Sequence, residues 1–139
     1  MADCLFCRIV SGELPATVVY EDDTSVAFLD HRPLFHGHTL LVPREHVETL
    51  GELPGKTVGP YFEAAQILSR AVESAMAAEG TFVAMNNRVS QSVPHLHVHI
   101  VPRRKKDGLK GFFWPRTKYK SDEEMGEVQK KISNALKKK

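Results

Sequence analysis

The chain has 139 residues, 42% of them hydrophobic and 26% charged, and a formal net charge of +2. These values fit one ordinary globular domain, and the small net charge gives no large electrostatic footprint for nucleic acid. The sequence contains no signal peptide and no apolar run near the about 18 residues that a membrane span needs. We therefore expect a soluble, cytoplasmic protein without a nucleic-acid or membrane partner, and we expect no structural disulfide from its two cysteines.

The first half of the chain predicts three strands and two short helices. Residues 4–15, CLFCRIVSGELP, indicate a short N-terminal helix that a glycine and a proline close. Residues 17–30, TVVYEDDTSVAFLD, indicate two strands around an acidic turn. A third strand follows over residues 37–43, GHTLLVP, and residues 44–50, REHVETL, indicate a short helix.

The second half predicts two helices and two strands. Thr57 to Ala78 form an amphipathic helix that ends before Gly80, and residues 121–137 form a C-terminal helix behind a capping-box sequence, SDEE. Strands are expected at TFVAMN and at the histidine run that begins at Pro94, with a polar turn between them. The apolar stripe of the long helix is Val58, Phe62, Ala65, Leu68, Val72 and Met76. The order of elements predicts an α+β fold with a mainly antiparallel five-stranded sheet, one long helix and a helix near each end.

Three of the seven histidines occupy alternate positions in one run, PHLHVHIVP. A strand would place His95, His97 and His99 on one face and the intervening apolar residues on the other. Three interpretations follow: a metal site, nucleophilic catalysis by a neutral imidazole, or histidines that merely pack. Neutral donors lie just upstream, at Asn86, Asn87, Gln91 and Ser92. These groups suit a phosphate or ribose and are poor zinc ligands, so they favour catalysis on a phosphorylated substrate.

The run HLHVHIV resembles the signature of the histidine triad (HIT) superfamily, three histidines separated by apolar residues. The resemblance extends to CLFCRIVSGELPATVVYEDDTSVAFLD, GHTLLVPREHVETL and NNRVSQSVPHLHVHIVPR, in the family's order, and covers about residues 4–104. It implies one HIT domain over residues 1–139, with residues 105–139 as a C-terminal extension. It also implies a HIT-like fold, a homodimer that binds a purine nucleotide, and no organic cofactor.

The resemblance implies catalytic roles for the triad. His97 falls on the family's nucleophile, which attacks the α-phosphorus and forms a nucleotidyl-histidine intermediate. His99 falls on the position that contacts the phosphate, and His95 on the one that supports the nucleophile or binds metal. His38 falls on a fourth histidine packed beside the triad, and Ser92 on a hydroxyl near the phosphate and the leaving group. The nucleophile must be neutral, and its other ring nitrogen needs a fixed acceptor such as a backbone carbonyl.

The amides of Gln91 and of either Asn86 or Asn87 fall where the family contacts the phosphate. The turn that carries them is two residues shorter than the family pattern, and Ser90 replaces the common glycine.

The nucleoside pocket is implied in the first half of the chain. Asp30 falls on the carboxylate that binds the ribose hydroxyls. Phe6, Ile9, Phe28 and His31 fall on positions that enclose the base, although Phe6 and Phe28 also fit an ordinary core. Apolar walls of this kind discriminate little between bases.

Cys4 and Cys7 form a C-x-x-C pair before the first predicted strand. In some HIT branches such a pair binds a structural zinc with two histidines, which match His46 and His95 here. Two cysteines and two histidines are a complete zinc set, and the alternative is a pair of reduced, unliganded thiols.

The expected activity is hydrolysis of purine nucleoside phosphoramidates with release of a nucleoside monophosphate. One alternative is hydrolysis of dinucleoside polyphosphates, with Arg103 to Lys106 holding the extra phosphates. Another is a nucleotide-binding or interaction protein with little turnover. In the Hint-like branch a C-terminal tryptophan shapes the choice of leaving group, a role that Trp114 could fill.

Overall fold

A computed structural model describes residues 3–109 and 116–137, so Trp114 lies outside the described residues. The chain divides after Asp107 into two compact units, which we describe separately. Among the described helices, none is long and apolar enough to cross a membrane.

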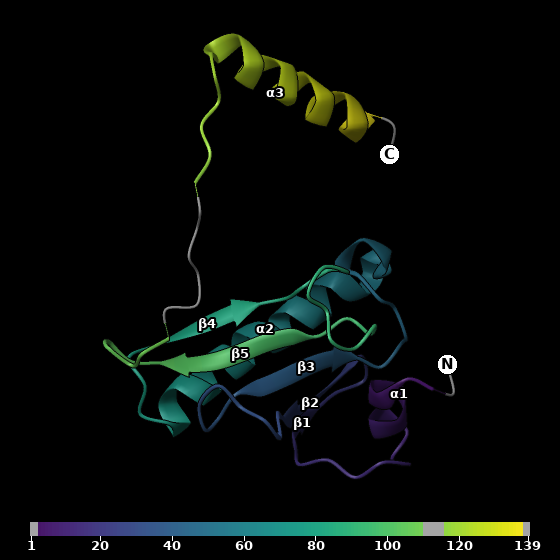
Figure 1. The fold of residues 1–139 in the computed structure, drawn as a ribbon. Helices are drawn as coiled ribbons and strands as arrows, with labels where there is room; N and C mark the ends of the chain where they lie inside the picture. Colours follow the sequence, from purple (N-terminus) through teal and green to yellow (C-terminus); the bar gives the residue numbers. More distant parts are fainter. Residues whose placement is uncertain (1–2, 110–115, 138–139) are drawn as a thin grey trace. The chain divides into compact units, whose positions relative to one another are not determined.

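The first unit is built around one five-stranded sheet, in which every neighbouring pair of strands is antiparallel. The strand order is β1-β2-β3-β5-β4, and α2 packs against β3, β4 and β5 (Figure 1). This architecture confirms the predicted α+β fold. The elements are α1 (Leu5–Val10), β1 (Val18–Glu21), β2 (Ser25–Leu29), β3 (Thr39–Pro43), the 3-10 turn η1 (Leu50–Glu52), α2 (Gly55–Ala75), β4 (Gly80–Ala84) and β5 (Val98–Arg103).

Two apolar clusters form because side chains alternate along the strands. In β2, Ala27 belongs to the cluster that includes α2, whereas Val26 and Phe28 belong to the cluster that includes Phe6 of α1. The sheet therefore has a core under α2 and a second, smaller core on the side of α1. The candidate site lies at this second core.

The short helix predicted over residues 44–50 is wrong. The chain bends there without helical hydrogen bonds, and the 3-10 turn η1 begins only at Leu50. The carbonyl of Val47 accepts a hydrogen bond of 2.7 Å from the amide of Leu96, so the backbone bonds across the fold instead of within a helix. The amide of Thr49 donates to Glu52 Oε1 at 3.1 Å and fixes the start of η1.

The long helix is confirmed, but its bounds and part of its buried face differ from the prediction. It ends at Ala75 because Ala77 takes a left-handed conformation with a φ of 51°, and Gly80 instead opens β4. Phe62 is 39% exposed. Tyr61 is the aromatic residue that is fully buried, and its hydroxyl donates to the carbonyl of Leu41 at 2.8 Å.

In the second unit, α3 (Asp122–Lys137) matches the helix predicted over residues 121–137. Ser121 Oγ accepts a hydrogen bond of 3.1 Å from the amide of Glu124, as a capping residue does. The carboxylate of Glu124 accepts from the amide of Lys120 at 2.8 Å, one residue before the position that a standard capping box uses.

Candidate active site and metal centre

The histidine run leads into the middle of the sheet, where β5 lies between β3 and β4. The predicted strand begins later than expected: only His99 lies within β5, and His95 and His97 precede it. The chain is bent before β5 because the amide of His95 donates to the carbonyl of Val93 at 2.8 Å.

The predicted separation of the two faces is nevertheless present. The apolar residues of the run are buried in the cluster that includes α2; they are Leu96, Val98 and Ile100. The rings of His95 and His97 meet Phe6 edge-on, with centroids 5.9 and 5.0 Å from that of Phe6. The rings of His97 and His99 lie 5.0 Å apart. The imidazoles therefore face the core beside α1.

A backbone carbonyl determines the tautomer of His97. Its Nδ1 lies 2.7 Å from the carbonyl oxygen of His95. A carbonyl only accepts, so Nδ1 carries the ring proton and Nε2 presents a lone pair. The side chain is 2% exposed, and it lines a cavity. The acceptor expected from the sequence is thus the carbonyl of the first histidine of the run.

A chain of hydrogen bonds fixes the tautomers of His38 and His99 in the same way. The amide of Leu34 donates to His38 Nδ1 at 3.1 Å, so the proton of that ring is on Nε2. His38 Nε2 then donates to His99 Nδ1 at 3.0 Å. The proton of the neutral His99 ring is consequently on Nε2, where it is available as a donor.

Burial keeps these rings neutral. Together with the nearby rings of His97 and His38, burial lowers the pKa of His99 to about 4, although the carboxylate of Asp30 opposes the shift. Burial also lowers the pKa of His38, although the carboxylate of Asp30, 3.7 Å from His38 Nε2, opposes that shift. Asp30, His38 and His99 are close enough to hold a metal ion. Because His38 Nε2 carries a proton in this network, these three residues do not fit a metal as arranged.

A cavity of about 740 Å³ brings together the residues predicted to bind the nucleoside. Its walls include Asp30, and the volume is within the range of ligand sites, about 300–1,000 Å³. The Phe6 and Phe28 rings meet edge-on at 5.4 Å between centroids, and both side chains are buried as well as lining the cavity. The other predicted residues in its wall are Ile9, His31, Ser92, His97 and His99.

Several lining residues were missed by the sequence reasoning. Leu5 could have been found, because it precedes Phe6 in α1 and is separated from Ile9 by one helical turn. The rest come from connecting segments or from neighbouring strands, and no local pattern marks them. They are Leu14, Pro15, Ala16, Thr17, Leu29, Leu40 and Val93.

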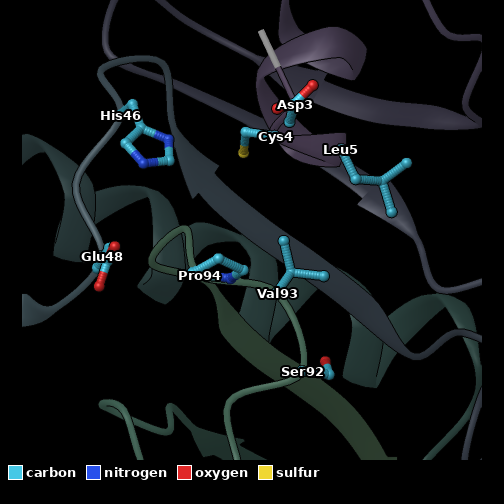
Figure 2. Close-up of a pocket in the computed structure, with 8 residues that line it drawn as sticks. All are labelled: Asp3, Cys4, Leu5, His46, Glu48, Ser92, Val93 and Pro94. Carbon is cyan, nitrogen blue, oxygen red and sulfur yellow. The ribbon is translucent and has the colours of Figure 1, made fainter. Parts of the chain in front are cut away.

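Ser92 borders a second cavity of about 450 Å³ (Figure 2). Leu5, Ser92 and Val93 line both cavities. Figure 2 shows Cys4 and His46 at the end of the second cavity that is remote from Ser92. Ser92 therefore lies at the boundary between the cavity predicted to hold the nucleoside, which we call the nucleoside cavity, and the second cavity, which Cys4 and His46 also line.

The amide side chains predicted to contact the phosphate form hydrogen bonds within the fold, unlike the side chain of Ser92. Gln91 Nε2 donates to the carbonyl of Glu48 at 2.7 Å, and Asn87 Oδ1 accepts from the amide of Leu50 at 2.7 Å. Asn86 Nδ2 donates to the carbonyl of Ser90 at 3.2 Å. None of the three amide residues is among those that line the two cavities. They hold the turn, in which Ser90 has a φ of 62° at the position where the family pattern has glycine.

Four potential metal ligands meet beside His97. The ligand atoms of Cys4, Cys7, His46 and His95 all lie within 4.8 Å of one another. Cys4 Sγ is 3.4 Å from His95 Nδ1, Cys7 Sγ is 3.2 Å from His46 Nδ1, and the two Nδ1 atoms are 3.2 Å apart. Zinc bonds of about 2.3 Å to sulfur and 2.0–2.1 Å to nitrogen give nitrogen–nitrogen and sulfur–nitrogen edges of about 3.3–3.6 Å in a tetrahedral site. The observed separations are close to these values.

The tautomer of His95 also fits a metal. Its Nε2 donates to the carbonyl of Pro43 at 2.9 Å, so Nδ1 presents its lone pair to the cysteines. Burial lowers the pKa of His95 and favours the neutral ring that a metal requires. In metal-free protein, burial raises the pKa of the Cys7 thiol. This shift disfavours the thiolate before a metal binds, but two cysteines and two neutral imidazoles are the donor types that zinc takes in a structural site.

Comparison with known proteins gives a family match over most of the chain. The model of the HIT domain family matches residues 11–106. Adenosine 5'-monophosphoramidase hnt1 of Schizosaccharomyces pombe is 34% identical over 136 residues, which cover 96% of this chain and 98% of that protein. Adenylylsulfatase HINT3 of Arabidopsis thaliana is 38% identical over 109 residues, which cover 77% of this chain. The match spans 55% of the Arabidopsis protein.

A solved structure also resembles the chain. It is described as a zinc-bound histidine triad family protein from Mycobacterium smegmatis, and it is 33% identical with a TM-score of 0.74. The match covers 99% of each chain. The similarity therefore includes a protein that binds zinc.

Proposed function

The chain belongs to the HIT domain family, and from this membership we propose that it is a nucleotide hydrolase acting on purine nucleoside phosphoramidates. The reaction breaks the phosphorus–nitrogen bond at the α-phosphate and releases a nucleoside monophosphate. The phosphoramidase from Schizosaccharomyces pombe, similar over nearly the whole chain, supports this substrate class.

One observation carries the proposal: the lone pair of His97 Nε2 is fixed by the hydrogen bond from Nδ1 to the carbonyl of His95. His97 shares its cavity with Asp30, a carboxylate that can accept hydrogen bonds from ribose hydroxyls. A neutral imidazole beside a nucleotide-sized cavity suits nucleophilic catalysis.

The proposed reaction has two steps. His97 Nε2 attacks the α-phosphorus in line, a nitrogen–phosphorus bond forms, and the bond to the leaving amine breaks. The leaving amine takes a proton from the hydroxyl of Ser92, which is reprotonated by solvent water and which borders the space beyond the cavity; the water that attacks in the second step returns one proton to solvent. Water then attacks the phosphorus, releases the nucleoside monophosphate and restores His97.

The neighbouring residues take supporting roles in this proposal. His99 donates from Nε2 to a phosphate oxygen, because its Nδ1 already accepts from His38. His95 supports the nucleophile through its carbonyl, while its ring is available to a metal. The amides of Asn86 and Gln91 would have to leave their present hydrogen bonds to reach a phosphate.

The proposal includes a structural zinc held by Cys4, Cys7, His46 and His95, supported by the geometry of these residues and by the zinc-bound relative. It also includes one HIT domain with a C-terminal extension, a homodimer and a cytoplasmic location. Light scattering of the purified protein and metal analysis by mass spectrometry test the dimer and the zinc.

The polyphosphate alternative receives less support. It relies on Arg103 to Lys106, but Arg103 Nε lies 2.6 Å from Asp107 Oδ2 and Arg104 donates to the carbonyl of Met76. Two of the four basic side chains are thus engaged within the fold. The Arabidopsis adenylylsulfatase makes adenylyl sulfate a further substrate worth testing.

The deciding experiment is intact-protein mass spectrometry after brief incubation with an adenosine phosphoramidate, quenched at alkaline pH. Wild type should carry an adenylyl adduct that the His97→Ala variant lacks. His36→Ala is the matched control, because His36 is exposed and does not line the nucleoside cavity.

The possible results separate the proposals. An adduct on both wild type and His97→Ala contradicts the assignment of the nucleophile. AMP release by wild type alone, without an adduct, means that the intermediate breaks down quickly. Cleavage of diadenosine polyphosphates or adenylyl sulfate, but not of the phosphoramidate, contradicts the proposed substrate class. Binding of AMP without any cleavage favours a nucleotide-binding protein.

A further inference from the structure

We infer that occupancy of the metal centre determines how tightly the nucleoside cavity binds its ligand, because helix α1 is shared by the two sites. The inference rests on the proposed function, since it takes a nucleotide as the ligand. It goes beyond that function by making the metal a determinant of nucleotide affinity.

Helix α1 is too short to be stable alone. It has six residues, whereas isolated helices shorter than about 12–15 residues are marginal in water. Cys4 Sγ accepts a long hydrogen bond of 3.4 Å from the amide of Cys7 at its start, and Gly12 follows its end with a φ of 84°. Phe6 is its only buried residue. The helix therefore depends on tertiary contacts to hold its position.

The metal ligands supply such contacts at the start of the helix. Cys4 is the residue before α1 and Cys7 lies in its first turn, so a bound ion would hold both ends of that turn. The other two ligands come from distant segments, since His46 follows β3 and His95 precedes β5. One ion would thus attach α1 to both segments.

The same short helix forms part of the nucleoside cavity. Leu5, Phe6 and Ile9 all line that cavity. Phe6 also packs edge-on against Phe28 and His97, with centroid distances of 5.4 and 5.0 Å. Release of the two cysteines would leave these cavity walls attached through the apolar packing of Phe6, Ile9 and Val10.

A second connection runs through His95. Its Nδ1 belongs to the metal set, and its carbonyl accepts the proton of His97 Nδ1 at 2.7 Å. Its Nε2 is already anchored to the carbonyl of Pro43 at 2.9 Å. A bound ion would also hold His95 through Nδ1. Because the carbonyl of His95 orients His97, the ion would help to fix the orientation of the proposed nucleophile.

Thermodynamic linkage makes the inference quantitative. If zinc raises the affinity for AMP by a certain factor, AMP must raise the affinity for zinc by the same factor. Coupling of this kind typically amounts to about 5- to 150-fold. Measuring the factor from both sides tests the coupling without any measurement of catalysis.

The experiment uses the full chain in zinc-loaded and chelator-treated forms. Calorimetry gives the dissociation constant of AMP for each form, and competition with a chromophoric chelator gives that of zinc with and without AMP. Hydrogen exchange of residues 5–10 is followed in the same four states. We expect zinc to tighten AMP binding at least about fivefold, AMP to tighten zinc binding equally, and each ligand to slow exchange in α1.

A pair of variants locates the coupling. Ile9→Ala removes part of the cavity wall on α1 and leaves all four metal ligands in place, so the coupling factor should fall. Ile67→Ala is the matched control, because Ile67 is 42% exposed on α2 and lies outside both sites. Its dissociation constants for AMP and for zinc should equal those of wild type.

Each alternative result has a separate meaning. Independent binding of zinc and AMP, with unchanged exchange in α1, overturns the inference but leaves the proposed function intact. Failure to bind zinc overturns the inference and the structural zinc of the proposed function, but leaves the proposed hydrolysis intact. Failure of the zinc-loaded protein to bind AMP overturns both the inference and the proposed function.

Discussion

Hydrogen bonds to backbone groups determine which ring nitrogen carries the proton in the site histidines. The carbonyl of His95 holds the proton on Nδ1 of His97, whereas the amide of Leu34 places it on Nε2 of His38. His38 Nε2 in turn donates to His99 Nδ1, so the ring proton of His99 is also on Nε2. The rings of His38 and His99 are neutral for a physical reason that can be tested, since burial lowers the pKa of both.

We predict that the free energy of unfolding falls as the pH is lowered from about 6.5 to about 4, in part through His99. The pKa of its ring is lowered from 6.5 to about 4, so within this range the unfolded chain binds a proton that the folded protein does not. Below about pH 4 this group causes no further loss, because both states are protonated.

Urea unfolding of wild type and His99→Asn over this pH range checks the prediction. The stability difference between the two proteins should shrink as the pH falls, because the variant lacks the titrating ring. His36→Asn, at an exposed position, should run parallel to wild type. A constant difference between wild type and His99→Asn contradicts the assignment.

A second residue-level prediction concerns His38, which should act as a positioning residue for His99. His38→Phe keeps a ring but removes the donor to His99 Nδ1, so the proton of His99 is no longer held on Nε2. A hydrogen bond to a charged group contributes about 1.5–3 kcal/mol, which corresponds to roughly 10- to 150-fold in kcat.

Steady-state kinetics with an adenosine phosphoramidate should show this fall in kcat with little change in KM. His36→Phe provides the same substitution at an exposed position and should match wild type. An unchanged kcat in a folded His38→Phe variant would show that His99 does not need this partner.

At the level of elements, the end of α2 shows how one backbone conformation sets a boundary. The apolar periodicity continues to Met76, but Ala77 adopts a φ of 51° and turns the chain towards β4. A left-handed conformation costs an alanine about 1–2 kcal/mol, so the sequence gives no local warning of this turn. Packing of the elements on both sides maintains it.

Ala77→Gly should therefore stabilise the protein. Removal of the left-handed strain outweighs the added chain entropy of glycine, which is about 0.5–1 kcal/mol, and leaves a gain of about 0.5–1 kcal/mol. Ala71→Gly is the matched control on an exposed position inside α2 and should destabilise by about 0.5–1 kcal/mol. Chemical denaturation measures the free energy of unfolding of both variants. Changes of the same sign relative to wild type would contradict the prediction.

At the level of the whole molecule, both candidate sites found among the described residues belong to the first unit. The residues that line the two cavities beside Ser92, and the four potential metal ligands, all lie between Asp3 and His99. The chain divides after Asp107. The first unit thus contains both candidate sites together with the sheet and α2 that support them.

A chain that ends at Asp107 should consequently fold and bind AMP. Its thermal transition should remain cooperative, and its dissociation constant for AMP should stay within about threefold of the full-length value, a change below 1 kcal/mol. Circular dichroism and calorimetry measure the two quantities. Loss of AMP binding by the folded truncated chain would assign residues 108–139 a direct part in the site.

The sequence was sufficient for the family, the α+β fold and half of the residues that line the larger cavity. Alternation in the histidine run and in β2 comes from the geometry of extended backbone, so the two faces could be predicted residue by residue. The C-x-x-C pair and the two histidines that match the family likewise predicted a group of four potential metal ligands, which the structure brings within 4.8 Å of one another.

Only the tertiary structure decided the proton positions, the bend over residues 44–50 and the placement of the amides. Each depends on a hydrogen bond between segments far apart in the chain, such as that from the amide of Leu96 to the carbonyl of Val47. The amide of Gln91 is engaged by the carbonyl of Glu48 for the same reason. Local sequence patterns report periodicity within one element, whereas such contacts exist only once the chain has folded and its distant segments meet.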